Sequence, residues 1–202
     1  MKQFIKKRWL WIVGACILAA VLVLLLVRCG NDPTANEPTL TVETPQKLSA
    51  SQTEEFSLDV TISALGDARY PAMSMSIAFD SSRLEFLGVE EGNLFVLSDE
   101  NSTGQQLPEW SCNVQNSNDT GLINIMYLDM TGGRNAFSKE FLADAYNVVL
   151  RLKFRLRGSV RPGDVLDLIV EDAVFAASDE TQSLAMTRDT LKVKNGRLVI
   201  GE

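Results

Sequence analysis

Apolar and polar residues alternate with a period of two through most of the chain after residue 38. In residues 56–63, for example, Phe56, Leu58, Val60 and Ile62 alternate with polar residues. Successive side chains of a β-strand point to opposite faces, so this pattern predicts strands with one buried face. About nine such segments, separated by turn residues, predict one all-β domain over residues 39–202, folded as an antiparallel sandwich.

Turn and helix signals lie between the predicted strands. Asn195-Gly196 is the strongest short hairpin signal, because this pair favours the two-residue turns that join antiparallel strands. The polar residues 116–121 predict a turn. Residues 138–145 predict a single short helix with Ser138 as its N-cap.

The segment at residues 121–133 is the most informative strand for function. Residues 122–129 have the composition of a strand between glycines, with Ile123, Ile125 and Tyr127 on one face and Leu122, Asn124, Met126 and Leu128 on the other. Burying an unpaired amide is costly, so the face of Asn124 is expected to be the solvated one. Met126 and Leu128 would then be exposed on a sheet face, which marks an interaction surface. The alternative is a strand buried on both faces, because short apolar runs fit either arrangement.

The N-terminal segment has a different pattern. Residues 1–8 are basic, and residues 9–27 contain no charged side chain and are long enough for a helix to cross a bilayer. The positive-inside rule places residues 1–8 in the cytoplasm. The sequence therefore predicts an uncleaved signal anchor at residues 9–28, a linker at residues 29–38 and an extracellular domain.

A lipid-anchored protein is the alternative to a signal anchor. Cys29 follows the apolar run and precedes the linker, as the acylated cysteine of a lipoprotein does. Arg28, directly before Cys29, departs from the small residues of a lipoprotein signal. This departure favours the signal anchor.

Composition excludes several kinds of function. The chain has no histidine, which removes Ser-His-Asp catalysis and histidine metal sites. Residues 1–28 hold five basic side chains and no acid, so the rest of the chain carries a formal charge of −12 within a total of −7. Such an acidic domain is a poor binder of nucleic acid. Adjacent carboxylates such as Glu90-Glu91 point to opposite faces of a strand, so no catalytic pair is indicated.

Five segments, in order, resemble the cohesin family. They are SIAFDSSRLEFLGVEEGN at residues 76–93, GLINIMYLDMTGG at 121–133, VVLRLKFRLR at 148–157, VFAASD at 174–179 and NGRLVI at 195–200. Each motif is weak alone, but together they cover roughly residues 39–201 at plausible spacing.

The resemblance implies a nine-stranded, jelly-roll-like sandwich without catalytic activity. Cohesins bind dockerins, which are small modules with EF-hand-like loops, through one sheet face. The calcium belongs to the dockerin, so no cofactor or metal site of this chain's own is expected. The expected partner is a dockerin-containing protein, an enzyme that degrades polysaccharide or a scaffold. The chain would tether this partner to the membrane.

The resemblance also implies which residues touch the partner. The outward positions of one strand are Ala72, Ser74 and Ser76; cohesins often have Asn and Asp where this chain has Ala72 and Ser74. On the strand at 122–129 the contact positions are Asn124, Met126 and Leu128, followed by Asp129 as an acidic contact and Gly132 in the turn. For Asp129 the alternative is a carboxylate that caps the turn.

A carbohydrate-binding module of the same architecture is the alternative function. Such a module needs exposed aromatic rings in a row to stack on sugars. After residue 38 the chain has one tryptophan, Trp110, and the tyrosines Tyr70, Tyr127 and Tyr146. Tyr127 is predicted to point inward, so no such row is evident.

Overall fold

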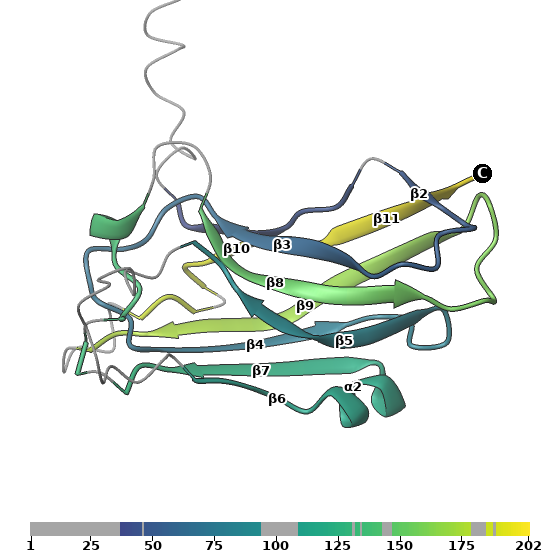
Figure 1. Ribbon diagram of the computed structural model, residues 1–202. Helices are drawn as coiled ribbons and strands as arrows, with labels where there is room; N and C mark the ends of the chain where they lie inside the picture. Colours follow the sequence, from purple (N-terminus) through teal and green to yellow (C-terminus); the bar gives the residue numbers. More distant parts are fainter. Residues whose placement is uncertain are drawn as a thin grey trace, which may run out of the picture. The chain divides into compact units, whose positions relative to one another are not determined.

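Two β-sheets pack face to face around a hydrophobic core in the computed structural model (Figure 1). The structure describes residues 37–45, 47–93, 109–130, 132–133, 135–142, 147–178, 185–187 and 189–202. These residues belong to one compact unit, Glu37–Glu202. The predicted all-β sandwich is therefore confirmed.

The sheets contain five and six strands. The spatial order of the first is β10 (Lys192–Lys194), β1 (Thr39–Val42), β3 (Phe56–Ile62), β8 (Val148–Leu156) and β5 (Leu84–Glu91). The order of the second is β2 (Leu48–Ser49), β11 (Gly196–Gly201), β9 (Val165–Ala176), β4 (Ala72–Ala78), β7 (Leu122–Leu128) and β6 (Glu109–Cys112). The described residues thus form more than the nine strands expected, partly because the two residues of β2 are too few to show alternation.

The core follows from the period-two pattern of both sheets. Alternate residues of β3, β4, β7 and β8 are buried between the sheets. Aromatic rings fill one part of this core: Phe154 of β8 has its ring centroid 5.5–6.2 Å from those of Phe56, Phe79 and Phe86. Such stacked, tilted and edge contacts add to the stabilisation from burial of apolar area.

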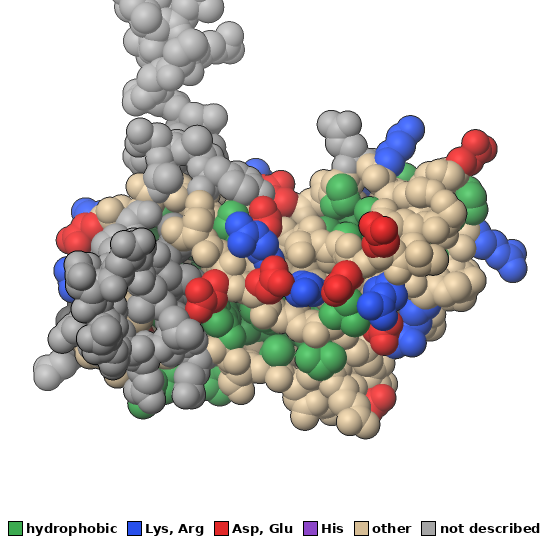
Figure 2. Space-filling model, viewed as in Figure 1, with side chains coloured by type: hydrophobic (Ala, Val, Ile, Leu, Met, Phe, Trp, Pro, Cys, Tyr) green, Lys and Arg blue, Asp and Glu red, His purple; other side chains and the backbone are tan. Residues whose placement is uncertain are grey.

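Ion pairs cover the outer face of the five-stranded sheet. Basic residues of β8, which lies between β3 and β5, pair with acids of those two strands: Arg151 with Asp59 at 3.1 Å, Lys153 with Glu90 at 3.1 Å, and Arg155 with Glu85 at 3.5 Å. Figure 2 shows acidic and basic side chains alternating over this part of the surface. Exposed pairs of this kind contribute little to stability. These pairs leave the outer face of the five-stranded sheet polar, with its acidic and basic side chains paired to one another.

The sandwich is not purely antiparallel, which corrects the prediction. β1 pairs with β10 in parallel, and β2 pairs with β11 in parallel. β10 ends just before Asn195 and β11 begins at Gly196, and these two strands belong to different sheets. The predicted hairpin at Asn195-Gly196 is therefore wrong. The chain crosses there from the five-stranded to the six-stranded sheet.

Packing explains the residues at this crossing. The side-chain oxygen of Asn195 accepts a hydrogen bond from the backbone N–H of Val170 at 3.0 Å. A Cβ on Gly196 would lie 2.8 Å from Cγ1 of Val42, closer than carbon atoms approach. Gly196 is therefore needed for close packing, whereas a hairpin turn would need its left-handed backbone freedom.

A helix, α2 (Val114–Thr120), replaces the turn that was predicted at residues 116–121. Asn113 is its N-cap and accepts from the N–H of Asn116; Gly121 ends it in the left-handed conformation, with φ of 72°. The predicted helix after Ser138 is a 3-10 turn, η1 (Lys139–Phe141), with Ser138 as its N-cap. Residues 143–145 lie outside the described part.

The predicted signal anchor at residues 9–28 lies outside the described residues. So do residues 1–8 and residues 29–36, which include Cys29. Within the described ranges of residues 37–202, no helix is long and apolar enough to cross a membrane.

Candidate partner-binding face

The outer face of β4 and β7 brings together six of the eight predicted contact residues. The two strands are antiparallel, and their register pairs Ala72 with Leu128, Ser74 with Met126, and Ser76 with Asn124. Asn124 is exposed, as its amide predicted, and the opposite face of β7 is buried. The alternative of a strand buried on both faces is therefore wrong.

An exposed apolar stripe runs along β7. Met126 is 57% exposed and Leu128 is 45% exposed. Met130, which follows the strand on the same side of the alternation, is 53% exposed. Met130 was not predicted, although it continues the period-two alternation past the end of the strand. Three large apolar side chains in a row mark an interaction surface more strongly than scattered ones do.

The neighbouring positions on this face are small and uncharged. Ala72 and Ser76 are half-buried, and Ser74 is exposed. The hydroxyl of Ser76 donates to Oδ1 of Asn124 at 2.7 Å, which fixes the orientation of the amide. Compared with the charged outer face of the other sheet, this face has apolar and neutral polar groups at its centre.

Asp129 is buried, although it was expected to lie on the surface as an acidic contact. Its side chain is 8% exposed, and Oδ2 accepts from the N–H of Gly133 at 2.7 Å. The carboxylate therefore caps the turn after β7, which was the alternative interpretation, and little of it is open to a partner. Gly132 is exposed in that turn, with φ of 73°.

Aromatic residues pack beneath this face, on the core side of the sheet. Tyr127 is buried, as predicted, and its hydroxyl donates to the carbonyl of Asn135 at 2.6 Å. Burial raises the pKa of this phenol, and the nearby acids Asp129 and Glu91 raise it further. The ring of Trp110 lies 4.9 Å from that of Tyr127 and packs against the core. The large hydrophobic residues exposed in the described part are Met126, Leu128, Met130, Ile169, Val193 and Val199, none of them aromatic.

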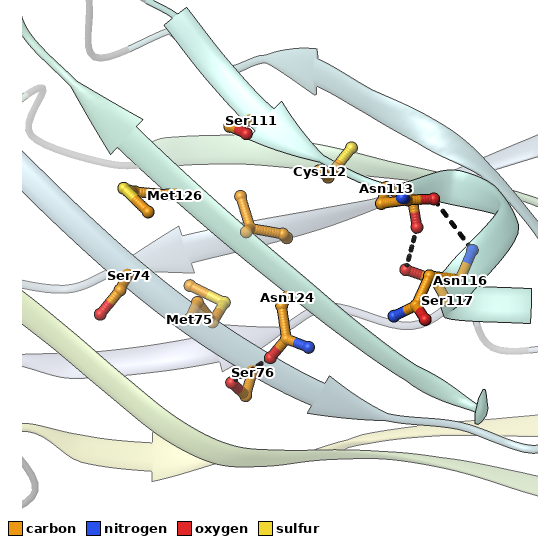
Figure 3. Close-up of a pocket in the computed structure, with 11 residues that line it drawn as sticks. Ser74, Met75, Ser76, Ser111, Cys112, Asn113, Asn116, Ser117, Asn124 and Met126 are labelled. Carbon is orange, nitrogen blue, oxygen red and sulfur yellow. Dashed lines mark hydrogen bonds between the residues drawn. The ribbon is translucent and has the colours of Figure 1, made fainter.

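A hollow with a mixed polar and apolar lining lies beside the apolar stripe, where α2 meets the sheet. It has a volume of about 350 Å³ and is lined from β4, β6, β7 and α2 (Figure 3). Asn116 and Ser117 of α2 line it and were not predicted, because residues 116–121 were interpreted as a turn. The available signal was Asn113 as an N-cap together with Gly121 at the helix end.

No protein-family model matches the chain, and no curated protein matches it in sequence. The solved structures give clear matches.

One match is the third cohesin of ScaC from Acetivibrio cellulolyticus, solved with the ScaB dockerin: TM-score 0.59, 12% identity, 82% of this chain and 99% of that chain. Another is the OlpA cohesin from Clostridium thermocellum, solved with Doc918: TM-score 0.60, 18% identity, with the same coverage. A third is a non-cellulosomal cohesin from the archaeon Archaeoglobus fulgidus: TM-score 0.50, 12% identity, 82% of this chain and 92% of that chain. The domain that begins at Glu37 therefore has the cohesin fold.

Proposed function

We propose that this chain is a non-catalytic, cohesin-like module that binds dockerin-bearing proteins through the outer face of β4 and β7. The observation that carries the proposal is the exposed stripe of Met126 and Leu128 on a regular strand, flanked by small neutral residues. Two of the solved structures that share its fold are complexes with dockerins. A regular sheet already holds its contact residues in place, so little conformational entropy is lost when a partner binds to this face.

The chemistry of the face suits a helix of the partner. Methionine side chains are flexible and polarizable, so Met126 and Met130 can adapt to an apolar surface. Burying each such side chain is worth roughly 1.5–3 kcal/mol. The partner would bring the calcium, because the loops of a dockerin need the ion to fold. Among the described residues no group of three or more Cys, Asp or Glu side chains is placed to hold a metal ion.

Calcium dependence is the first test of this proposal. The full chain, in detergent micelles, is titrated by calorimetry with a panel of purified dockerins that includes the ScaB dockerin and Doc918. We expect at least one dockerin to bind in calcium and to lose all binding when the ion is chelated. Absence of binding in both conditions, together with retention of the chain on insoluble cellulose, would contradict the proposal and favour a carbohydrate-binding module.

The location of the domain is a second part of the proposal. We infer that residues 9–28 are a single-pass signal anchor, with residues 1–8 in the cytoplasm and the domain outside, so that bound dockerins are held near the membrane. The uncharged run and the basic residues before it support this inference. Intact mass of the chain extracted from membranes should equal that of the full sequence. Cleavage before Cys29 with an added diacyl group would instead show a lipoprotein.

A further inference from the structure

The described methionines fall into two groups by exposure. Met126 is 57% exposed and Met130 is 53% exposed, and both belong to the apolar stripe along β7. The others, Met73, Met75 and Met186, are 1–3% exposed and lie in the core. Among the described methionines, solvent and small solutes therefore reach only the two on the proposed partner-binding face.

The thioether of an exposed methionine is open to oxidation. Hydrogen peroxide transfers one oxygen atom to the sulfur: an S–O bond forms, the O–O bond of the peroxide breaks, and water is released. The sulfur loses two electrons and becomes a sulfoxide, which methionine sulfoxide reductases convert back to the thioether. The reaction thus replaces a flexible apolar side chain with a polar one, and the change is reversible.

The free thiol near this face is less open to the same oxidant. Cys112 of β6 lines the hollow beside Met126 and is half-buried. Its burial raises the pKa of the thiol, and peroxide reacts with the thiolate, so little of the reactive form is present at neutral pH. Leu128, between the two methionines along the stripe, has no group that peroxide oxidises. A mild oxidant therefore changes this face first at Met126 and Met130.

We propose that peroxide regulates dockerin binding to this face by oxidising Met126 and Met130 to sulfoxides. The inference rests on the proposed function and deepens it by naming how the face is regulated. A fully extended chain of four residues spans at most about 14 Å, so one partner of ordinary interface size covers both side chains. In the complex each sulfoxide oxygen loses its hydration against an apolar partner surface, which opposes binding. Reduction to the thioethers restores the apolar stripe and with it the affinity.

The test treats the full chain, in detergent micelles, with hydrogen peroxide and removes the oxidant with catalase. Calorimetry then measures its affinity for an untreated, calcium-loaded dockerin from the panel, and peptide mass mapping counts the oxygen atoms added at each methionine. We expect Met126 and Met130 to be oxidised at least tenfold faster than the three buried methionines. Once both carry oxygen, the affinity should fall at least tenfold, while thermal unfolding shows that the domain stays folded. Methionine sulfoxide reductases should return the affinity to within twofold of its starting value.

The comparison variant is Met126→Leu with Met130→Leu, because leucine is close to methionine in volume and does not react with peroxide. Each protein is compared with its own untreated form, so any effect of the substitutions on the starting affinity cancels. Peroxide should change the affinity of the leucine variant less than twofold.

Three outcomes would overturn the inference and leave the proposed function standing. The first is unchanged affinity of the wild-type chain when both methionines are sulfoxides. The second is an equal loss in the leucine variant, since another oxidised group would then be responsible. The third is a folded wild-type chain whose affinity the reductases do not restore. If the untreated wild-type chain binds no dockerin, the proposed function and this inference both fail.

Discussion

Replacing Met126 and Leu128 together with aspartate should abolish dockerin binding while the domain stays folded. The two side chains are 57% and 45% exposed, so the folded domain tolerates charges there. In a complex the double variant would lose the burial of two apolar side chains, roughly 1.5–3 kcal/mol each. Two buried carboxylates would add a desolvation penalty. A total above about 3 kcal/mol corresponds to a loss of more than 100-fold in affinity.

The fold of this variant is protected by the other side of β7. Ile123, Ile125 and Tyr127 are 0–2% exposed and remain unchanged, so the register with β4 and the core contacts persist. The matched control is Val193→Asp with Val199→Asp, because both valines are 40% exposed and lie on β10 and β11. Calorimetry and thermal unfolding are measured on both pairs. A folded Met126/Leu128 variant that binds as tightly as the wild type would refute the assignment of the face.

Replacing Asn118 with alanine should lower the free energy of unfolding by about 2–3 kcal/mol, because two backbone groups lose their partners. The side chain of Asn118 projects from α2 and bonds to both backbone groups of Phe86 in β5. Oδ1 accepts from the N–H at 2.9 Å, and Nδ2 donates to the carbonyl at 2.8 Å. β5 is at the edge of its sheet, so no further strand is present to bond the N–H and C=O of Phe86. The amide of Asn118 takes the place of that strand.

Equilibrium urea unfolding, followed by circular dichroism, measures this effect. Asn118→Asp keeps an acceptor for the N–H of Phe86 but places a carboxylate against its carbonyl, so it should be at least as destabilising as alanine. Gln115→Ala is the control, because this residue is exposed on the same helix, and it should change stability by less than about 0.5 kcal/mol. A stability of Asn118→Ala equal to that of Gln115→Ala would show that the paired bonds to Phe86 do not hold α2 in place.

The faces of the strands were predictable from the sequence, because each depends on alternation within a few residues. A single polar residue, Asn124, was sufficient to orient β7, since burial of its amide without a partner is costly. The same rule predicted that Tyr127 points inward. Residues whose environment is set by the strand's own pattern were therefore placed correctly.

Features that depend on distant segments were not predictable in this way. Asn195-Gly196 favours a tight turn locally, but the close approach of Val42, more than 150 positions away in the chain, decides its structure. The burial of Asp129 follows from the N–H of Gly133, which becomes available only once the turn has formed. In the same way, the hollow beside the apolar stripe forms only when α2 folds against β4, β6 and β7 and brings their lining residues together.

The parallel pairing of β1 with β10 and of β2 with β11 has a consequence for the order of folding. β1 has a nearby antiparallel partner in β3, but the parallel partners of β1 and β2 lie in residues 192–201, roughly 150 positions later. These parallel contacts therefore carry a large loop-closure entropy. The antiparallel pairs β4–β7 and β3–β8 can form before that segment is synthesised. Until it arrives, β1 and β2 lack their parallel partners, and each exposes a strand edge that can pair with other chains. The outer face of β4 and β7 would thus be assembled before the domain is closed, and closure of the sandwich would be a late step of folding.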